Sequence, residues 1–96
     1  MYVTMTSDKT SPQRTPRVEA FLGEFLPRLR RFQGVRAIHH FPRPDHGDDM
    51  TIIIWDSEDA VGVYRTSDLI KEAAAFEKRQ RTQVAREACP LAITLL

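Results

Sequence analysis

Residues 50–73 read MTIIIWDSEDAVGVYRTSDLIKEA, and this stretch decides which fold the chain adopts. Ile52–Ile54 form an apolar run. Because neighbouring strand residues point to opposite faces, such a run is typical of a strand that is covered on both faces. Ser57 and Ser67 each precede acidic residues, as N-caps do at the start of a helix. The stretch therefore predicts a buried strand, then a short helix and a longer helix.

A further helix is predicted upstream of this stretch. Thr15 and Pro16 supply an N-cap and a proline at the first helical position, where its missing N–H costs nothing. From there apolar residues recur at helical spacing as far as Gly34, a residue type that often ends a helix. Pro27 lies inside the pattern and is expected to kink the helix, because it removes one hydrogen bond.

Short β-prone runs complete the pattern. The longer helix is expected to continue to Pro90, with Glu77 and Arg81 forming an i,i+4 ion pair. Residues 7–14 are expected to be a polar loop. The predicted strands lie at residues 2–6, 35–41, 50–55 and 91–96, with a turn-rich connection at 42–49. This β-α-β-β-α-β order predicts a ferredoxin-like α+β fold with an antiparallel sheet and a central third strand.

Length and composition predict one small domain over residues 1–96. The formal net charge is +1 with both signs interspersed, so no nucleic-acid partner is expected. The first ten residues lack the features of a secretory signal, and no apolar run approaches the ~20 residues that cross a bilayer. Cys89 is the single cysteine, which fits a reducing compartment. We expect a cytoplasmic protein without a membrane partner.

The apolar run Ile52–Ile54 also predicts a protein partner. One layer of helices covers only one face of a sheet, so another surface must cover the second face. Hydrophobic residues make up 42% of this chain, although a chain of 96 residues has only a small core of its own. We therefore expect a homodimer that buries one face of each sheet.

The order of signals within residues 55–73 resembles the antibiotic biosynthesis monooxygenase-like family. A strand ends in Trp55, Ser57–Asp59 opens a short helix, Tyr64 follows nine residues after the tryptophan, and the sequence TSD opens the longer helix. The upstream segment FLPRLRRFQGV, residues 25–35, is similar to the first helix of that family and its exit glycine. The resemblance implies a dimeric α+β barrel, in which two sheets pack face to face.

That family includes cofactor-independent monooxygenases that make quinones from polycyclic phenols, haem-degrading enzymes and many members without known activity. In the haem-degrading members a tryptophan of the short helix ruffles the haem, and an iron-binding histidine follows ten residues later. This chain has Tyr64 and Ala74 at those positions, and only Thr6 or Ser7 where those members keep an asparagine. The resemblance therefore disfavours haem degradation, and we expect no cofactor.

Four aromatic residues are candidates for the lining of a pocket. Trp55 and Tyr64 each combine an apolar body with one hydrogen-bonding tip, so they can serve both as walls and as donors. Phe21 and Phe25 are the candidates on the upstream helix. The alternative is that these side chains only fill the core between helix and sheet.

The segment HHFPRPDHGDD, residues 39–49, holds three histidines and three aspartates. His39 and His40 point to opposite faces of a strand, and no pair in the segment has the ligand spacing of a zinc motif, so no metal site is expected. One of the two histidines faces the interior, where an imidazole can exchange a proton near neutral pH. His39 or His40 is therefore the candidate base, and a hydrogen-bonded structural histidine is the alternative.

Two functions of different classes follow from these observations. The first, implied by the resemblance, is a cofactor-independent monooxygenase that acts on a small aromatic or polycyclic phenol. It would use a dry apolar pocket, a base and donors for the developing oxyanion. The second is a non-catalytic dimeric module that binds a small ligand or serves as an assembly unit. The absence of a tight acid–base cluster in the sequence favours the second function.

Overall fold

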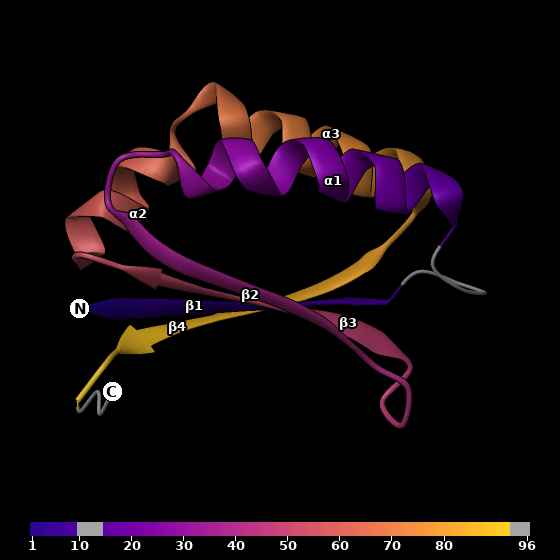
Figure 1. Cartoon of the computed structure of the whole chain (residues 1–96), viewed down its shortest axis with the longest axis horizontal. Helices are drawn as coiled ribbons and strands as arrows, with labels where there is room; N and C mark the ends of the chain where they lie inside the picture. Colours follow the sequence, from indigo (N-terminus) through magenta and orange to yellow (C-terminus); the bar gives the residue numbers. More distant parts are fainter. Residues whose placement is uncertain (10–14, 93–96) are drawn as a thin grey trace.

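The sheet of the computed structural model has four antiparallel strands in the order β2-β3-β1-β4, so that β3 and β1 are central (Figure 1). The structure describes residues 1–9 and 15–92. The strands are β1 (Tyr2–Lys9), β2 (Val35–Arg43), β3 (Asp48–Trp55) and β4 (Gln83–Pro90), and the helices are α1 (Pro16–Arg30), α2 (Glu58–Arg65) and α3 (Asp68–Gln80). The predicted ferredoxin-like α+β fold is confirmed.

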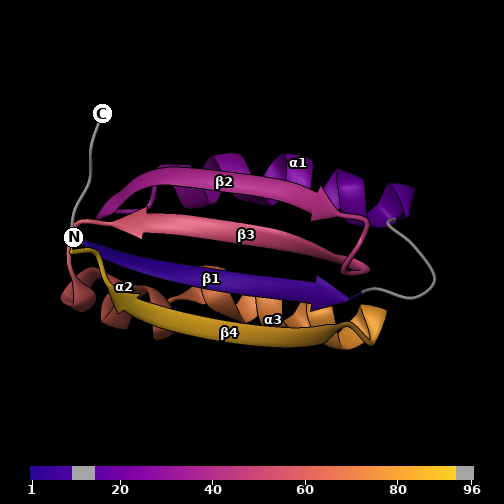
Figure 2. The same cartoon turned by 90° about the horizontal axis from the view of Figure 1, so that it is seen from below.

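The three helices lie on one face of the sheet (Figure 1). Seen from the opposite side, the strands are in front, with α1 behind β2 and α3 behind β4 (Figure 2). No described helix or strand lies over this second face, which we call the open face. Register and alternation place on it Val3, Met5, Ser7, Ala37, His39, Phe41, Arg43, Asp48, Met50, Ile52, Ile54, Ala85, Glu87 and Cys89. The apolar run of β3 therefore supplies side chains to both faces of the sheet.

β1 is longer than predicted, because the strand continues to Lys9 instead of giving way to a loop after residue 6. Asp8 pairs with Asp49 of β3 on one side and with Val84 of β4 on the other. Two neighbouring ladders satisfy the backbone of this segment although its side chains are polar. Residues 10–14 of the expected loop lie outside the described residues. The extension places Asp8 on a central strand.

The predicted boundary between the last helix and the last strand is wrong. α3 ends at Gln80, where Arg81 takes up a left-handed φ of 53°, and β4 runs over Gln83–Pro90 instead of residues 91–96. Beyond Phe76 the helical face becomes polar, so a longer helix would bury no further apolar surface. As a strand, the same segment gains a full hydrogen-bonded ladder with β1.

This boundary also changes the predicted ion pair. Glu77 does not pair with Arg81; its carboxylate accepts hydrogen bonds of 2.7 Å from the guanidinium of Arg86 on β4. The contact ties the end of α3 to the edge strand. Of the expected strand 91–96, residues 93–96 lie outside the described residues.

All three predicted N-caps are present. Thr15 Oγ1 accepts a hydrogen bond from the backbone N–H of Val18 at 3.3 Å, which starts α1. Ser57 Oγ accepts from the backbone N–H of Ala60 at 3.2 Å, and Ser67 Oγ accepts from the backbone N–H three residues later at 3.3 Å. Each cap satisfies one amide that would otherwise lack a partner. No described helix is long and apolar enough to cross a membrane.

Gly34 does not end α1, which stops four residues earlier at Arg30 and remains helical through Pro27. The glycine lies in the connection to β2 with a φ of +92°. A Cβ at this position would lie 2.5 Å from the Cβ of Ala60. Glycine is needed here because the chain makes a left-handed turn directly against α2.

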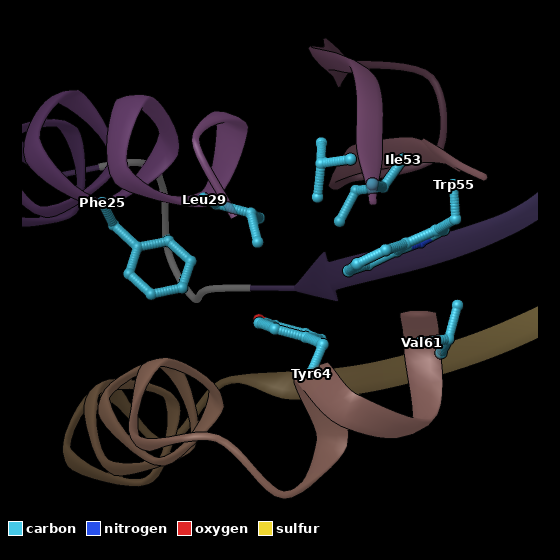
Figure 3. Close-up of a cluster of buried hydrophobic side chains, with 7 residues drawn as sticks. Phe25, Leu29, Ile53, Trp55, Val61 and Tyr64 are labelled. Carbon is cyan, nitrogen blue, oxygen red and sulfur yellow. The ribbon is translucent and has the colours of Figure 1, made fainter. Parts of the chain in front are cut away.

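The core lies between the helices and the sheet, on the face opposite the open face. Trp55 is completely buried in it, and Ile53 is 6% exposed. Figure 3 shows side chains of α1, α2 and β3 converging on this region. The buried cluster consists of Phe25, Leu29, Val35, Ile53, Trp55, Val61 and Tyr64. We call this side of the sheet the helix-covered face.

Candidate functional site

A cavity of about 210 Å³ lies between the helices and the helix-covered face of the sheet. Five aromatic side chains line it, and they come from α1, β3, α2 and α3: Phe21, Phe25, Trp55, Tyr64 and Phe76. A polar end is formed by side chains of the strands and of the last turn of α3: Thr6, Asp8, His40, Asp49, Thr51, Glu77 and Arg86. The cavity is therefore amphipathic.

The aromatic rings form two groups. Phe21 of α1 stacks on Phe76 of α3 with a centroid separation of 4.0 Å, and on Phe25 at 5.1 Å. Trp55 and Tyr64 lie 5.3 Å apart at a tilted angle. Flat rings that already stack on one another present surfaces that suit another planar ring.

The indole of Trp55 serves as a wall and has no donor left for a ligand. Its Nε1–H donates a hydrogen bond of 2.9 Å to Thr4 Oγ1 on β1. Thr4 and Trp55 lie diagonally across the β1–β3 ladder on the same face, so this bond links the two central strands. The donor that was predicted for a ligand is therefore used within the sheet itself.

Tyr64 presents its hydroxyl to the inside of the cavity. In Figure 3 the ring extends from α2, and its oxygen is directed toward the side of Phe25. Burial raises the pKa of Tyr64 to about 12; to a smaller extent Arg86 lowers this pKa and Glu77 raises it. The phenol therefore stays neutral at ordinary pH and can donate a hydrogen bond.

The two adjacent histidines lie on opposite faces of β2. His40 is opposite Thr51 in the β2–β3 ladder and lines the cavity, and its Nδ1 lies 2.8 Å from Thr51 Oγ1. His39 is opposite Ile52 and is exposed on the open face. Of the two candidates, only His40 can meet a ligand in the cavity.

Asp8 is a cavity residue that the sequence did not reveal. It lies on β1 at the polar end, and its Oδ1 atom is buried without a hydrogen-bond partner among the described residues. Burial raises the pKa of Asp8 to about 6, and Glu77 adds to this effect while Arg86 opposes it. The alternation of Thr4, Thr6 and Asp8 with odd-numbered residues could have signalled this placement, but the polar composition of the segment favoured a loop.

The surroundings of Asp8 are more acidic than basic. Glu77 and Asp49, which line the cavity with it, both raise its pKa, and Asp48 does so as well. Arg86 is the cation that lowers it, and the guanidinium of Arg86 is already bound to both carboxylate oxygens of Glu77. Acidic side chains therefore outnumber basic ones around Asp8 at the polar end of the cavity.

The cavity surface of α3 contains no side chain that ligates haem iron in the way histidine does. Ile70, Ala73, Phe76 and Glu77 are the residues of α3 that line the cavity. Ala74, the position that the resemblance equated with the iron ligand, is exposed. Among the described residues, no group of three or more His, Cys, Asp or Glu side chains is placed to hold a metal ion.

Solved structures share this fold over nearly the whole chain. A protein from Deinococcus radiodurans, named as a candidate antibiotic biosynthesis monooxygenase, superposes with a TM-score of 0.84 at 14% identity, with 100% of this chain and 99% of that chain covered. SnoaB, a cofactor-independent oxygenase from Streptomyces nogalater, superposes with a TM-score of 0.74 at 16% identity, with 98% and 96% covered.

A third similar structure is that of MhuD with two manganese protoporphyrin IX molecules bound per active site. It superposes with a TM-score of 0.74 at 12% identity, with 99% of this chain and 98% of that chain covered. No family model and no curated protein sequence matches the chain. The shared fold, at these identities, does not select between the activities of these proteins. The chain has the antibiotic biosynthesis monooxygenase-like fold, as the resemblance of residues 55–73 predicted.

Proposed function

We propose that the cavity binds a small planar phenol and that the protein acts on it as a cofactor-independent monooxygenase. The observation that carries this proposal is the amphipathic cavity, which has stacked aromatic walls and an imidazole at its polar end. Apolar pockets with a few converging polar groups are the usual form of small-molecule sites. The likeness to SnoaB, a cofactor-independent oxygenase, supports the reaction class.

The proposed reaction converts a phenol to a quinone with molecular oxygen as the oxidant. Loss of the phenolic proton gives an anion whose negative charge is shared with the ring carbon para to the oxygen. That carbon transfers an electron to O₂ and then bonds to the reduced oxygen, forming a hydroperoxide. Loss of water leaves a second carbonyl, so one oxygen atom enters the substrate and the other leaves as water. The substrate supplies all four electrons.

His40 is the proposed base for the proton transfer. Its ring faces the cavity, and the contact of Nδ1 with Thr51 fixes the orientation of the imidazole. Tyr64 is the proposed donor to the oxyanion, because its neutral hydroxyl faces the same space. Trp55, Phe21 and Phe25 are the proposed walls.

The volume of the cavity limits the size of the ligand. A dry cavity of about 150 Å³ holds benzene, whereas sites for drug-sized ligands start at about 300 Å³. At about 210 Å³ this cavity fits an aromatic of one or two rings. A four-ring phenol or a porphyrin would require the helices to move apart, so we propose a small phenol and disfavour haem.

A non-catalytic binding module is the second candidate function. It is favoured by the hydrogen bond from Trp55 to Thr4, which leaves the indole unable to assist the oxyanion. Such a module would bind the same ligands without consuming oxygen. Oxygen consumption therefore distinguishes the monooxygenase from the binding module, whereas ligand affinity does not.

The open face is the proposed surface of a homodimer. Four apolar residues of its two central strands are only half-buried in the single chain, namely Met5 of β1 and Met50, Ile52 and Ile54 of β3. Stable dimers often bury surfaces of this composition. Sedimentation analysis should therefore give about twice the mass of one chain at micromolar concentration, and a mass of one chain would contradict the proposal.

The test of the activity uses 1-naphthol, whose conversion to 1,4-naphthoquinone follows the stoichiometry given above. We expect oxygen uptake and quinone absorbance to appear together in the wild type, and both to fall in His40→Ala. The matched control is His39→Ala, which removes the same side chain from the open face and should retain the rate per folded protein. Binding without oxygen uptake would favour the binding module, and equal rates in both variants would exclude His40 as the base.

A further inference from the structure

The polar end of the cavity presents an acceptor before any ligand is bound. Asp8 contributes a carboxyl oxygen, Oδ1, that is buried and has no hydrogen-bond partner among the described residues. Such an atom is costly in the folded protein, because water has been removed from it and nothing has replaced the lost hydrogen bonds. A donor brought by a ligand would remove this cost.

The groups around Asp8 leave the acceptor available. Thr6 and His40 line the same end of the cavity from β1 and β2, and Thr6 is only two residues from Asp8 on the same strand face. Arg86 is the cation that acts on Asp8, and both carboxylate oxygens of Glu77 already bind its guanidinium. A carboxylate on the ligand would therefore meet repulsion from Asp8 and Glu77, and the cation that acts on Asp8 is already paired with Glu77.

We propose that Asp8 anchors the ligand, before its proton passes to His40, by accepting a hydrogen bond from its hydroxyl group, so that the cavity selects uncharged aromatic hydrogen-bond donors and rejects aromatic carboxylates. The inference rests on the proposed binding of planar aromatics in this cavity. It adds a ligand class that the aromatic walls alone do not specify, because a hydroxyl, an ether and a carboxylate on one ring system offer those walls the same surface.

Three naphthalenes test this selection: 1-naphthol, 1-methoxynaphthalene and 1-naphthoate. Their binding is measured by calorimetric titration without oxygen, at pH 7.5, so that no ligand is converted. A hydrogen bond to a charged acceptor corresponds to about tenfold or more in affinity. We expect 1-naphthol to bind about ten- to hundredfold more tightly than the ether, and 1-naphthoate to bind more weakly than the ether.

Asp8→Ala should abolish the preference for 1-naphthol over the ether, and Asp8→Asn should improve the binding of 1-naphthoate by about tenfold. The control is Asp45→Asn, which makes the same charge change in the exposed turn between β2 and β3 and should leave all three affinities unchanged. Ala73→Leu narrows the cavity and should weaken all three ligands alike, which would place them there.

The pH dependence of ligand binding is a second measurement of the role of Asp8. A bound hydroxyl favours the ionised form of Asp8, so the preference for 1-naphthol should decline as the pH falls through about 6. The other titratable or charged groups that act on Asp8 or line the cavity with it are Glu77, Arg86, Asp49, Asp48, His40, Tyr64, Arg65 and Glu87. A pH dependence that persists in Asp8→Asn would therefore come from one of these groups and would contradict the proposal.

The outcomes separate this inference from the proposed function. Equal affinities of 1-naphthol and its ether in the wild type, with both weakened by Ala73→Leu, would overturn the role of Asp8 and leave the aromatic-binding cavity in place. A wild type that binds none of the three ligands would overturn both.

Discussion

The two faces of β3 carry the same type of residue in different surroundings. Ile53 packs under the helices and is 6% exposed, whereas its neighbours Ile52 and Ile54 are only half-buried on the open face. The helix-covered face also lines the cavity with its half-buried carboxyl and imidazole. The comparison shows that one strand can build a core with a cavity on one side and leave half-buried apolar side chains on the other, because side chains alternate.

The largest expected effect is on assembly. Ile52→Asp places a charge at the centre of the open face, and the symmetry of a homodimer would bury it twice. We expect the free energy of dimer dissociation to fall by roughly 6 kcal/mol or more, which leaves a monomer in sedimentation analysis.

Val63→Asp is the matched control for that change, because Val63 is 61% exposed on α2 and lies away from the open face. This variant should sediment as the wild type does. If Ile52→Asp kept the wild-type mass, the open face would not be the interface.

The next largest effect is on the free energy of unfolding, and it should differ between the adjacent residues Ile53 and Ile52. Ile53→Ala removes core contacts and should lower the free energy of unfolding by about 2–5 kcal/mol, as measured by denaturant titration. Ile52→Ala should lower it at high protein concentration and progressively less on dilution, because the contacts it loses are those across the proposed dimer. Equal losses at every concentration would show that both residues belong to one core.

Replacing Asp8 and replacing Asp48 should change the stability of the fold in opposite directions. Burial raises the pKa of Asp8 to about 6 from 3.8, so the folded chain binds more protons than the unfolded chain between those values. Stability should therefore fall as the pH rises from about 4 to 6. Asp8→Asn should raise the free energy of unfolding at pH 7.5 by about 1–2 kcal/mol, after allowance for solvent screening of this partly exposed group.

Asp48, at the margin of the open face, should affect stability in the opposite direction to Asp8. Hydrogen bonds from Arg43, at 2.8 and 2.6 Å, and from Ser7 hold the pKa of Asp48 well below its usual range. Its contribution to stability is present above the unfolded pKa and is lost as the pH falls through the folded pKa. Asp48→Asn should therefore lower the melting temperature at pH 7.5. Melting curves that moved in the same direction for both variants would contradict this assignment.

The smallest effect is expected at Tyr64. Its ring packs against Trp55, but its hydroxyl faces the cavity, so Tyr64→Phe keeps the packing. We expect the free energy of unfolding to change by less than about 0.5 kcal/mol, and the rise in melting temperature caused by 1-naphthol to become smaller. A large loss of stability without ligand would show that the hydroxyl has a structural partner.

The sequence predicted those features that depend on local chemistry. Thr15, Ser57 and Ser67 start helices because a side-chain oxygen at that position binds an amide of the first turn, whatever the rest of the fold is. The resemblance within residues 55–73 likewise predicted the fold that the solved structures share. The residues of each signal lie close together in the sequence, so the signal can be recognised without knowing how the strands pair.

The errors of prediction lie where a distant strand supplies the partner. Residues 7–9 and 83–90 are polar or mixed in composition, yet they are strands because each finds a ladder with a segment far away in the chain. Trp55 loses its donor to Thr4 and Glu77 takes Arg86 as its partner for the same reason. In each case the partner lies on another strand and was not indicated by the neighbouring residues in the sequence.

The sequence by itself determined the three N-capped helices and the alternation of β3. It also showed that His39 and His40 must point to opposite faces of their strand. Only the tertiary structure decided that His40 faces the cavity and that Asp8 joins it there. The reason is that a site is made by side chains from several elements. Their meeting depends on register and on where each strand ends, and those features are set by long-range pairing and packing.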